Sequence, residues 1–210
     1  MRIDPEGKKI VFVFLIIALF CAMTKGTVGY IFAGVFVFLA LFSLYFFRDP
    51  KRQAPEDEGT IVSPADGVVA TVGEATLEKH GTCHRIGIFM NIFDVHVNRS
   101  PIAATVEALD YREGSFKHAG TEEAFENNEQ MIIDLAGDDL SMRVVQIAGM
   151  VARRVVCRLE VGQRLSRAER IGLIRFGSRL EVFIPKDKAF INVTKGDRVV
   201  CGESVIARRT

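Results

Sequence analysis

An uncharged apolar run at residues 28–47 constrains this chain of 210 residues more than any other feature. A helix of that length is about 30 Å long, which matches the hydrocarbon core of a bilayer. A second apolar run covers residues 10–23, and the turn sequence TKGT at residues 24–27 separates the two runs. A buried core helix is a poor alternative, because a small soluble domain cannot enclose so long an apolar helix on all sides. The sequence therefore predicts a transmembrane helical hairpin within residues 1–50.

Positive charges lie on the outer flanks of this hairpin. Three basic residues precede the first run, three follow the second, and a single one lies between the runs: Arg2, Lys8, Lys9, Arg48, Lys51, Arg52 and Lys25. The positive-inside rule then predicts that the soluble part faces the cytoplasm at the cell (inner) membrane. A cleaved signal peptide is the alternative. It is disfavoured because the first run lacks a small-x-small site, and Phe20 stands where a lipoprotein signal needs a small residue.

Residues 54–210 have the pattern of one soluble domain made mostly of strands. Short β-branched segments alternate with turn residues, as in HRIGIFMNI and AFINVTKGDRVVCGESVIA. This pattern predicts a mostly β (α+β) fold, either a β-sandwich or a distorted barrel. Two closely spaced turns, at residues 195–197 and 202–203, are typical of barrel-sandwich hybrids such as biotinyl and lipoyl domains. Helical patterns are confined to residues 121–127 and 166–170.

The composition disfavours several other classes of protein. Lys and Arg number 27 against 26 Asp and Glu, so the charge balance gives no reason to expect a nucleic-acid partner. Four cysteines, at positions 21, 83, 157 and 201, form no CxxC pair, which argues against a disulfide framework and suits a reducing compartment. His80, Cys83 and His84 share a short segment but make an incomplete metal site, and no metal is expected.

Three separated motifs carry residues suited to nucleophilic catalysis. Asp66 lies in SPADG, His96 lies in FDVHVNRSP, and Ser178 follows Gly177 in RFGSR. Together they are the parts of a base-activated nucleophile. Gly177 leaves its carbonyl sterically open and Ser178 supplies a hydroxyl, as an N→O acyl shift requires. Taken singly, SPADG and the Gly-Ser step are also typical of turns, and a histidine in a strand is often structural.

Taken together, SPADGVV, FMNIFDVHVNRSP, NNEQ, IAGMVARRVVC and IGLIRFGSRLEVFIP resemble the short prokaryotic form of the phosphatidylserine decarboxylase family, over about residues 46–207. The resemblance implies a proenzyme that cleaves itself between Gly177 and Ser178 and converts Ser178 into a covalent pyruvoyl group. Residues 1–177 then form the β chain and residues 178–210 the α chain of a heterodimer.

The resemblance also implies how the residues act. Asp66, His96 and Ser178 match the self-processing triad of the family. The pyruvoyl group forms a Schiff base with the serine amine of a membrane phospholipid, and phosphatidylserine becomes phosphatidylethanolamine and CO₂. His96 is the favoured group for returning a proton to the carbon that CO₂ leaves.

Less specific candidates are the basic side chains near these motifs. Five arginines are candidates for binding the phosphate or the serine carboxylate through bidentate contacts, although a solvated basic strip explains them equally well: Arg99, Arg153, Arg154, Arg175 and Arg179. Longer relatives carry another histidine three residues before the triad histidine, where this chain has Phe93. His118 is the candidate replacement, with an ordinary loop residue as the alternative.

Two other functions stay open at this point. The same chemistry on another phosphoserine lipid, such as archaetidylserine, needs the same catalytic residues. A membrane-tethered lipoyl- or biotinyl-like carrier is the second alternative, because residues 187–189, DKA, resemble the lipoyl-acceptor tripeptide. The KGD turn follows Lys188 too closely for a swinging-lysine hairpin, which favours a simple turn at this point.

Overall fold

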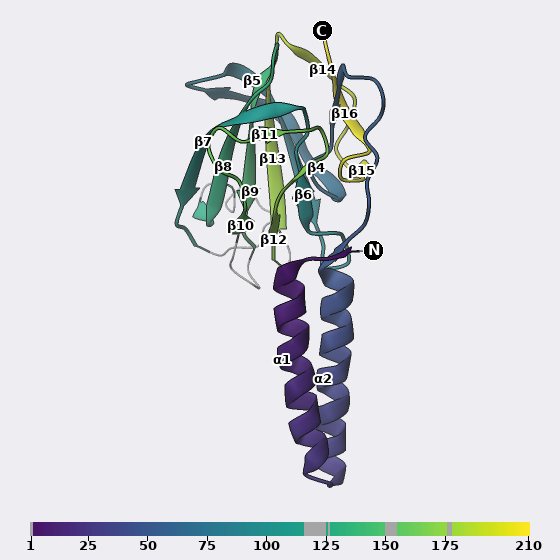
Figure 1. Ribbon diagram of the computed structural model, residues 1–210. Coiled ribbons are helices and arrows are strands. Elements are labelled where there is room, and N and C mark those ends of the chain that lie inside the picture. Colours follow the sequence, from purple (N-terminus) through teal and green to yellow (C-terminus); the bar gives the residue numbers. More distant parts are fainter. Residues whose placement is uncertain (1, 116–124, 126, 150–154, 176–177) are drawn as a thin grey trace. The chain divides into compact units, whose positions relative to one another are not determined.

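The computed structural model describes residues 2–115, 125, 127–149, 155–175 and 178–210. The chain divides into two compact units, Met1–Lys51 and Arg52–Thr210. Figure 1 labels the helices and many of the strands, and the two units are described separately below.

The first unit contains two helices that coincide with the two apolar runs. Helix α1 spans Pro5–Met23 and helix α2 spans Thr27–Phe46, and the two lie side by side (Figure 1). A short antiparallel pair, β1 (Arg2–Ile3) and β2 (Arg48–Asp49), joins the segments that flank the helices. Among the described helices, only α2 is long and apolar enough to cross a membrane. The apolar part of α1, residues 10–23, covers only about 21 Å because its first turns are charged.

Local contacts explain where α1 begins and how closely the chain packs there. The carboxylate of Asp4 accepts a hydrogen bond from the backbone N–H of Glu6 at 2.9 Å, and Pro5 occupies the first helical position. Both features favour the start of a helix. Gly7 lies directly against the Phe47 side chain, where a Cβ atom would overlap the ring. Glycine therefore permits this close approach between α1 and the residue that follows α2.

The second unit is built from strands. In chain order they are β3 (Thr60–Val62), β4 (Gly67–Leu77), β5 (Gly81–Met90), β6 (Val97–Arg99), β7 (Ala104–Arg112), β8 (Gln130–Ala136), β9 (Ser141–Ile147), β10 (Val155–Cys157), β11 (Arg164–Leu165), β12 (Arg170–Ile174), β13 (Ser178–Pro185), β14 (Ala189–Ile191), β15 (Arg198–Val199) and β16 (Val205–Arg209).

Eight of these strands form one antiparallel sheet, in the order β11-β7-β8-β9-β13-β5-β4-β15. Two three-stranded sheets accompany it, in the orders β10-β12-β6 and β14-β16-β3. Figure 1 shows the large sheet curling into a half-barrel. The mostly β class that the sequence predicts is confirmed, and of the two predicted arrangements the curled sheet is closer to the distorted barrel.

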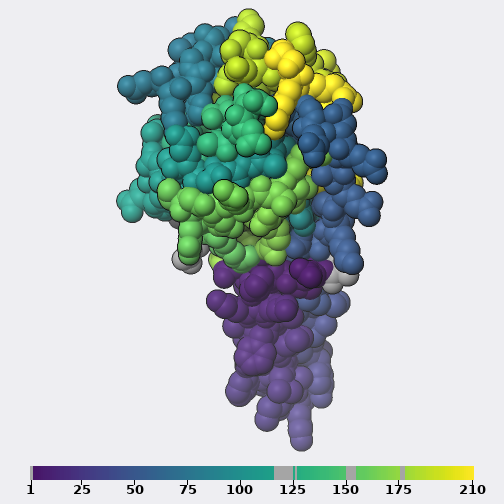
Figure 2. Space-filling view, turned by 45° about the horizontal axis from the view of Figure 1, so that its top comes forward, coloured from purple at the N-terminus to yellow at the C-terminus, as the bar shows by residue number. Residues whose placement is uncertain are grey.

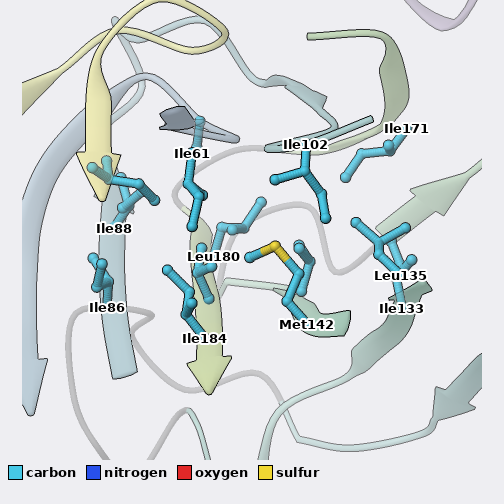
Figure 3. Close-up of a cluster of buried hydrophobic side chains, with 14 of the residues drawn as sticks. Ile61, Ile86, Ile88, Ile102, Ile133, Leu135, Met142, Ile171, Leu180 and Ile184 are labelled. Carbon is cyan, nitrogen blue, oxygen red and sulfur yellow. The ribbon is translucent and has the colours of Figure 1, made fainter. Parts of the chain in front are cut away.

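Strand β13 occupies the centre of the large sheet, with β5 on one side and β9 on the other. Its alternate side chains Leu180, Val182 and Ile184 are fully buried and belong to the main hydrophobic core. Figure 3 shows Leu180 and Ile184 among isoleucines of the neighbouring strand β5. The opposite face of β13 is also buried, where Phe183 packs in a second, smaller apolar cluster. A strand buried on both faces cannot leave the fold without unfolding the sheet.

The C-terminal strand pairs with a strand near the beginning of the second unit. Strand β16 pairs antiparallel with β3, and Figure 2 shows the yellow C-terminal residues beside the blue segment that contains β3. The turns predicted before β15 and before β16 are confirmed. Each contains a glycine in the left-handed region, Gly196 at φ 101° and Gly202 at φ 75°, where residues other than glycine are strained.

One of the two predicted helical segments is wrong. Residues 166–169 form a turn between β11 and β12, with Ala168 at a φ of 63°, and Arg170 is already the first residue of β12. The carboxylate of Glu169 accepts a hydrogen bond from the N–H of Ser166 at 2.8 Å. This local bond resembles one half of a helix capping box, but here it closes a turn instead. Of the other predicted segment, residues 121–127, only Phe125 and Asn127 are described, and both are helical.

Candidate active site

Ser178 is the first residue of β13 and is completely buried. It pairs with Met90 at the end of β5, and its side chain lies on the same face of the sheet as Leu180. The hydroxyl of Ser178 lies 3.9 Å from the Met90 sulfur, which is its weak acceptor. Gly177, the other half of the predicted cleavage site, lies outside the described residues. The nucleophile predicted from the sequence therefore faces the interior of the half-barrel.

His96 stands directly before β6 and is 2% exposed. Its Nδ1 atom lies 3.0 Å from the backbone carbonyl oxygen of Asp94. Because a carbonyl can only accept, Nδ1 carries a proton in this contact, and the neutral ring then has its lone pair at Nε2. The backbone carbonyl of His96 accepts from the N–H of Ile174 at 3.3 Å. This bond holds His96 beside the end of β12, four residues before Ser178.

The loop that carries His96 is fixed by the Asp94 carboxylate. One oxygen of this buried carboxylate accepts from the N–H of Asn91 at 2.9 Å, and the other accepts from the Arg198 guanidinium at 2.5 Å. Asp94 thus ties the His96 loop both to its own beginning and to β15. A histidine ring held in this way keeps one orientation, which a general base needs.

Asp66 lies in the turn between β3 and β4, at the position that the sequence predicts for the orienting carboxylate. Its carboxylate accepts two hydrogen bonds from Arg52 Nη2, at 2.9 and 2.8 Å, and one from the backbone N–H of Cys201 at 2.7 Å. The same turn adjoins β6, because the N–H of Arg99 donates to the Pro64 carbonyl at 3.0 Å. Among the described residues Asp66 thus bonds to Arg52 and Cys201, so its role in orienting His96 stays a prediction.

Cys201 links this turn to the strand that follows His96. Its thiol is buried and lies 3.2 Å from the carbonyl oxygen of Pro64 and 3.5 Å from that of Val97. Burial, and then the negative charge of Asp66, raise the pKa of the Cys201 thiol. Cys201 is therefore an inert packing residue that brings the Asp66 turn and the His96 strand together.

Comparison with known proteins identifies the family. The family profile described as phosphatidylserine decarboxylase matches residues 39–207, which include all three motif residues. The chain belongs to the phosphatidylserine decarboxylase family. It is 42% identical to the phosphatidylserine decarboxylase proenzyme of Trichlorobacter lovleyi, over 98% of this chain and 96% of the relative. It is also 45% identical to the proenzyme of Solibacter usitatus, over 90% of this chain and 89% of the relative.

The basic residues predicted to bind the substrate of a phosphatidylserine decarboxylase are dispersed. Arg179 is 1% exposed, on the face of β13 opposite to Ser178, where its guanidinium pairs with Glu181 at 2.5 Å and bonds to Thr71 at 2.8 Å. This geometry favours a structural role for Arg179. Arg99 donates to the carbonyl of Ala168 at 3.0 Å, and Arg175 is half-buried at the end of β12. Arg153, Arg154 and His118 lie outside the described residues.

Two residues of the predicted incomplete metal site, His80 and Cys83, make hydrogen-bonding contacts of their own. His80 Nε2 lies 3.4 Å from an oxygen of Asp134, and the thiol of Cys83 lies 3.6 Å from the His80 carbonyl oxygen. In the part of the chain that the structure describes, no three His, Cys, Asp or Glu side chains converge as metal ligands do.

Sequence reasoning missed two polar residues at this site, Arg52 and Gln146. Arg52 binds the Asp66 carboxylate, but in the sequence it is only one of several basic residues after the second apolar run. Gln146 is completely buried and donates from Nε2 to Asn98 Oδ1 at 2.8 Å. An isolated glutamine within the apolar segment VVQIA is a signal that could have drawn attention to it.

Proposed function

We propose that this protein is a membrane-bound, self-processing enzyme that converts phosphatidylserine into phosphatidylethanolamine and CO₂. The observation that carries the proposal is the family match over residues 39–207, which contains Asp66, His96 and Ser178 in their motifs. The burial of His96 and Ser178 supports it, because a dry site strengthens both proton transfer and charge stabilisation.

In the proposed self-processing step, the Ser178 hydroxyl attacks the carbonyl carbon of Gly177. His96 Nε2 takes the hydroxyl proton, and the peptide bond is replaced by an ester to Ser178 Oγ. Loss of the Cα proton of residue 178 then breaks the Cβ–Oγ bond, forms the Cα=Cβ double bond and releases residues 1–177 with a free carboxylate. The dehydroalanine that remains at position 178 reacts with water, releases ammonia and leaves a pyruvoyl group. Asp66 is assigned to this step as the predicted orienting carboxylate.

The surroundings of Ser178 fit a pyruvoyl group. The position is completely buried at the start of a central strand, with Met90 opposite and His96 held beside the preceding strand. When present, the pyruvoyl group supplies a ketone that takes up the substrate amine and withdraws electrons as CO₂ leaves. His96 is assigned the return of a proton to that carbon, from Nε2. Its Nδ1 contact with the Asp94 carbonyl fixes the orientation of the ring for both steps.

The two fragments are expected to stay together after cleavage as a heterodimer. Residues 178–210 contain β13, β14, β15 and β16. Strand β13 is hydrogen-bonded to β5 and β9, and both of these neighbours belong to residues 1–177. Separating the fragments would break two antiparallel ladders and expose a strand that is buried on both faces. Cleavage thus changes the chemistry at position 178 while the sheet stays intact.

The first unit is assigned as the membrane anchor, with the second unit in the cytoplasm. The length and apolar character of α2 support a span, and α1 supplies the second arm of a hairpin. The basic residues on both flanks favour cytoplasmic ends. An anchor suits an enzyme whose substrate is a phospholipid, because it keeps the active site close to the head groups.

The alternatives make different predictions for one experiment. The purified full-length protein and its Ser178→Ala variant are incubated with phosphatidylserine vesicles, and CO₂ release and the product lipid are measured. We expect CO₂ and phosphatidylethanolamine from the wild type and neither from the variant. A cleaved wild-type protein that acts on archaetidylserine but not on phosphatidylserine would favour the related lipid. An uncleaved chain with lipoyl or biotin on Lys188 would favour the carrier, although Lys188 lies in a short turn after β13.

A further inference from the structure

A line of buried polar side chains leads from Ser178 into the interior of the half-barrel. The hydroxyl of Ser178 and the amide nitrogen of Asn98 both point to the Met90 sulfur, at 3.9 and 3.6 Å. Gln146 Nε2 in turn donates to Asn98 Oδ1 at 2.8 Å. All four side chains are completely buried. Polar groups at this depth are costly, so each needs a reason to be there.

The thioether fixes the direction of every bond in this line. A methionine sulfur can only accept, so the Asn98 amide must turn its NH₂ group toward Met90. Its oxygen then faces Gln146, and Gln146 must present its own NH₂ group to that oxygen. The Gln146 oxygen Oε1 is therefore directed away from Asn98. Exchanging the oxygen and nitrogen positions of either amide would place two acceptors against each other, so the chain of bonds itself fixes which amide atom is the oxygen.

This leaves a buried acceptor without a donor. Among the described residues, Gln146 Oε1 has no hydrogen-bond partner. Gln146 lies opposite Leu180 in the β9–β13 ladder, and Leu180 is two residues from Ser178, so all three side chains face the same side of the sheet. Buried acceptors in proteins are nearly always satisfied. An unsatisfied one on the face that carries the reacting residue indicates a donor supplied by a ligand.

We propose that Gln146 Oε1 accepts a hydrogen bond from the amine of the substrate's serine head group. This inference rests on the proposed function. Of the polar groups in that head group, the carboxylate and the phosphodiester offer only acceptor oxygens, which an amide oxygen repels. The amine is the one donor, and it is also the group that has to approach position 178. Gln146 is thus a positioning residue for the substrate amine, and Asn98 holds it in place.

The test compares Gln146→Met, Gln146→Glu and the control Gln130→Met. Methionine has a similar length but no acceptor oxygen, whereas a glutamic acid side chain, which burial keeps protonated, retains an acceptor oxygen and can still donate from its O–H to Asn98 Oδ1. Gln130 is also a buried glutamine, but its Nε2 donates to the Phe125 carbonyl, and its neighbour Met131 is the residue that pairs with Gln146. Gln130 therefore lies on the opposite face of the sheet from Gln146. All variants are made in the full-length chain, and cleavage is followed by intact mass.

Binding is measured on cleaved protein whose ketone has been reduced with borohydride, so that it does not depend on turnover. The probes are dihexanoyl phosphatidylserine and the same lipid with 3-hydroxypropionate in place of serine, which lacks the amine. We expect the wild type, Gln130→Met and Gln146→Glu to prefer the amine-containing lipid. Gln146→Met should lose about tenfold or more of this preference, as expected for a hydrogen bond to a charged donor.

The outcomes separate this inference from the proposed function. A cleaved Gln146→Met protein with the wild-type preference overturns the inference and leaves the function intact. A Gln146→Met protein that folds but does not cleave also overturns it, since the residue then serves processing. If Gln146→Met does not fold, the lipid-binding measurement on Gln146→Glu tests the proposal instead. Loss of the preference for the amine-containing lipid in Gln146→Glu would contradict it. A wild-type chain that never cleaves overturns the proposed function and this inference with it.

Discussion

Asp134 on β8 allows a quantitative prediction about the stability of the second unit. The residue is 5% exposed, and its carboxylate accepts hydrogen bonds from Arg143 on β9 at 2.7 and 3.0 Å. Burial alone would raise the pKa of this carboxyl. The hydrogen bonds and charge of Arg143, together with His80 and Lys79, outweigh burial and lower the Asp134 pKa from 3.8 to about 2. The folded protein therefore stabilises the ionised form of Asp134 more than water does.

The size and sign of the effect follow from this pKa. At about 1.4 kcal/mol per pKa unit, the ionised Asp134 contributes about 2 kcal/mol to the free energy of unfolding. Because the pKa is lower in the folded state, the contribution is complete above about pH 5, falls to about half at pH 3 and disappears below about pH 2. For a unit of this size, 2 kcal/mol corresponds to a melting temperature about 4–8 °C higher.

The assay compares the melting temperatures of Asp134→Asn and of the control Asp139→Asn at pH 7 and pH 3. Asp139 is an exposed acid in the turn after β8. Both variants are made in the Ser178→Ala background, in detergent, so that chain cleavage does not affect the transition. We expect Asp134→Asn to lower the melting temperature at pH 7 and to lower it less at pH 3, whereas the control changes little. An unchanged melting temperature at pH 7, or an equal loss at both pH values, would show that the ionised Asp134 carboxylate does not stabilise the second unit.

Three further predictions concern catalysis, packing and topology. His96→Ala should fold with a near-normal melting temperature but cleave about 10²–10⁴ times more slowly on a gel time course; normal cleavage would remove His96 from the mechanism. Gly87→Ala places a Cβ 2.7 Å from Arg179 Nη2 and 2.8 Å from Glu181 Oε1, and both of these side chains are buried. The substitution should therefore lower the free energy of unfolding, measured by thermal melts, by about 1–3 kcal/mol. An unchanged stability would contradict this packing. A C-terminal alkaline phosphatase fusion should be inactive, because the C-terminus is expected in the cytoplasm, and an active fusion would overturn that topology.

The parts of the fold that depend on local sequence could be predicted. The length of the apolar runs determines α1 and α2, and β-branched segments bounded by Gly and Asp determine most strands. The Ser166–Glu169 pattern led to a wrong helix prediction, because the same side-chain bond can cap a helix or close a turn. In the structure Ala168 has a left-handed backbone conformation, which is compatible with the turn and not with a helix. The order of strands in the sheet, with β13 between β5 and β9, depends on contacts between distant segments that no local pattern contains.

The candidate site shows the same division. Ser178 and His96 could be predicted as candidates from their motifs, because the proposed chemistry requires those residue types, and their roles stay predictions. The partners of Asp66 could not be predicted, since Arg52 reaches it from 14 residues away and Cys201 from 135 residues away, through the folding of three separate segments. The isolated Gln146 in VVQIA could have been noticed in the sequence, but its proposed role could not be predicted, because the unsatisfied buried oxygen is a property of the folded structure.

Self-activation of the chain at Ser178 can be measured from the intact mass of the purified full-length protein. We expect two fragments, residues 1–177 and residues 178–210, with the smaller one blocked to Edman sequencing because its first residue carries a ketone instead of an amine. The Ser178→Ala protein should remain one chain. A preparation of intact 210-residue chains that nevertheless releases CO₂ from phosphatidylserine would show that activity does not require cleavage at Ser178.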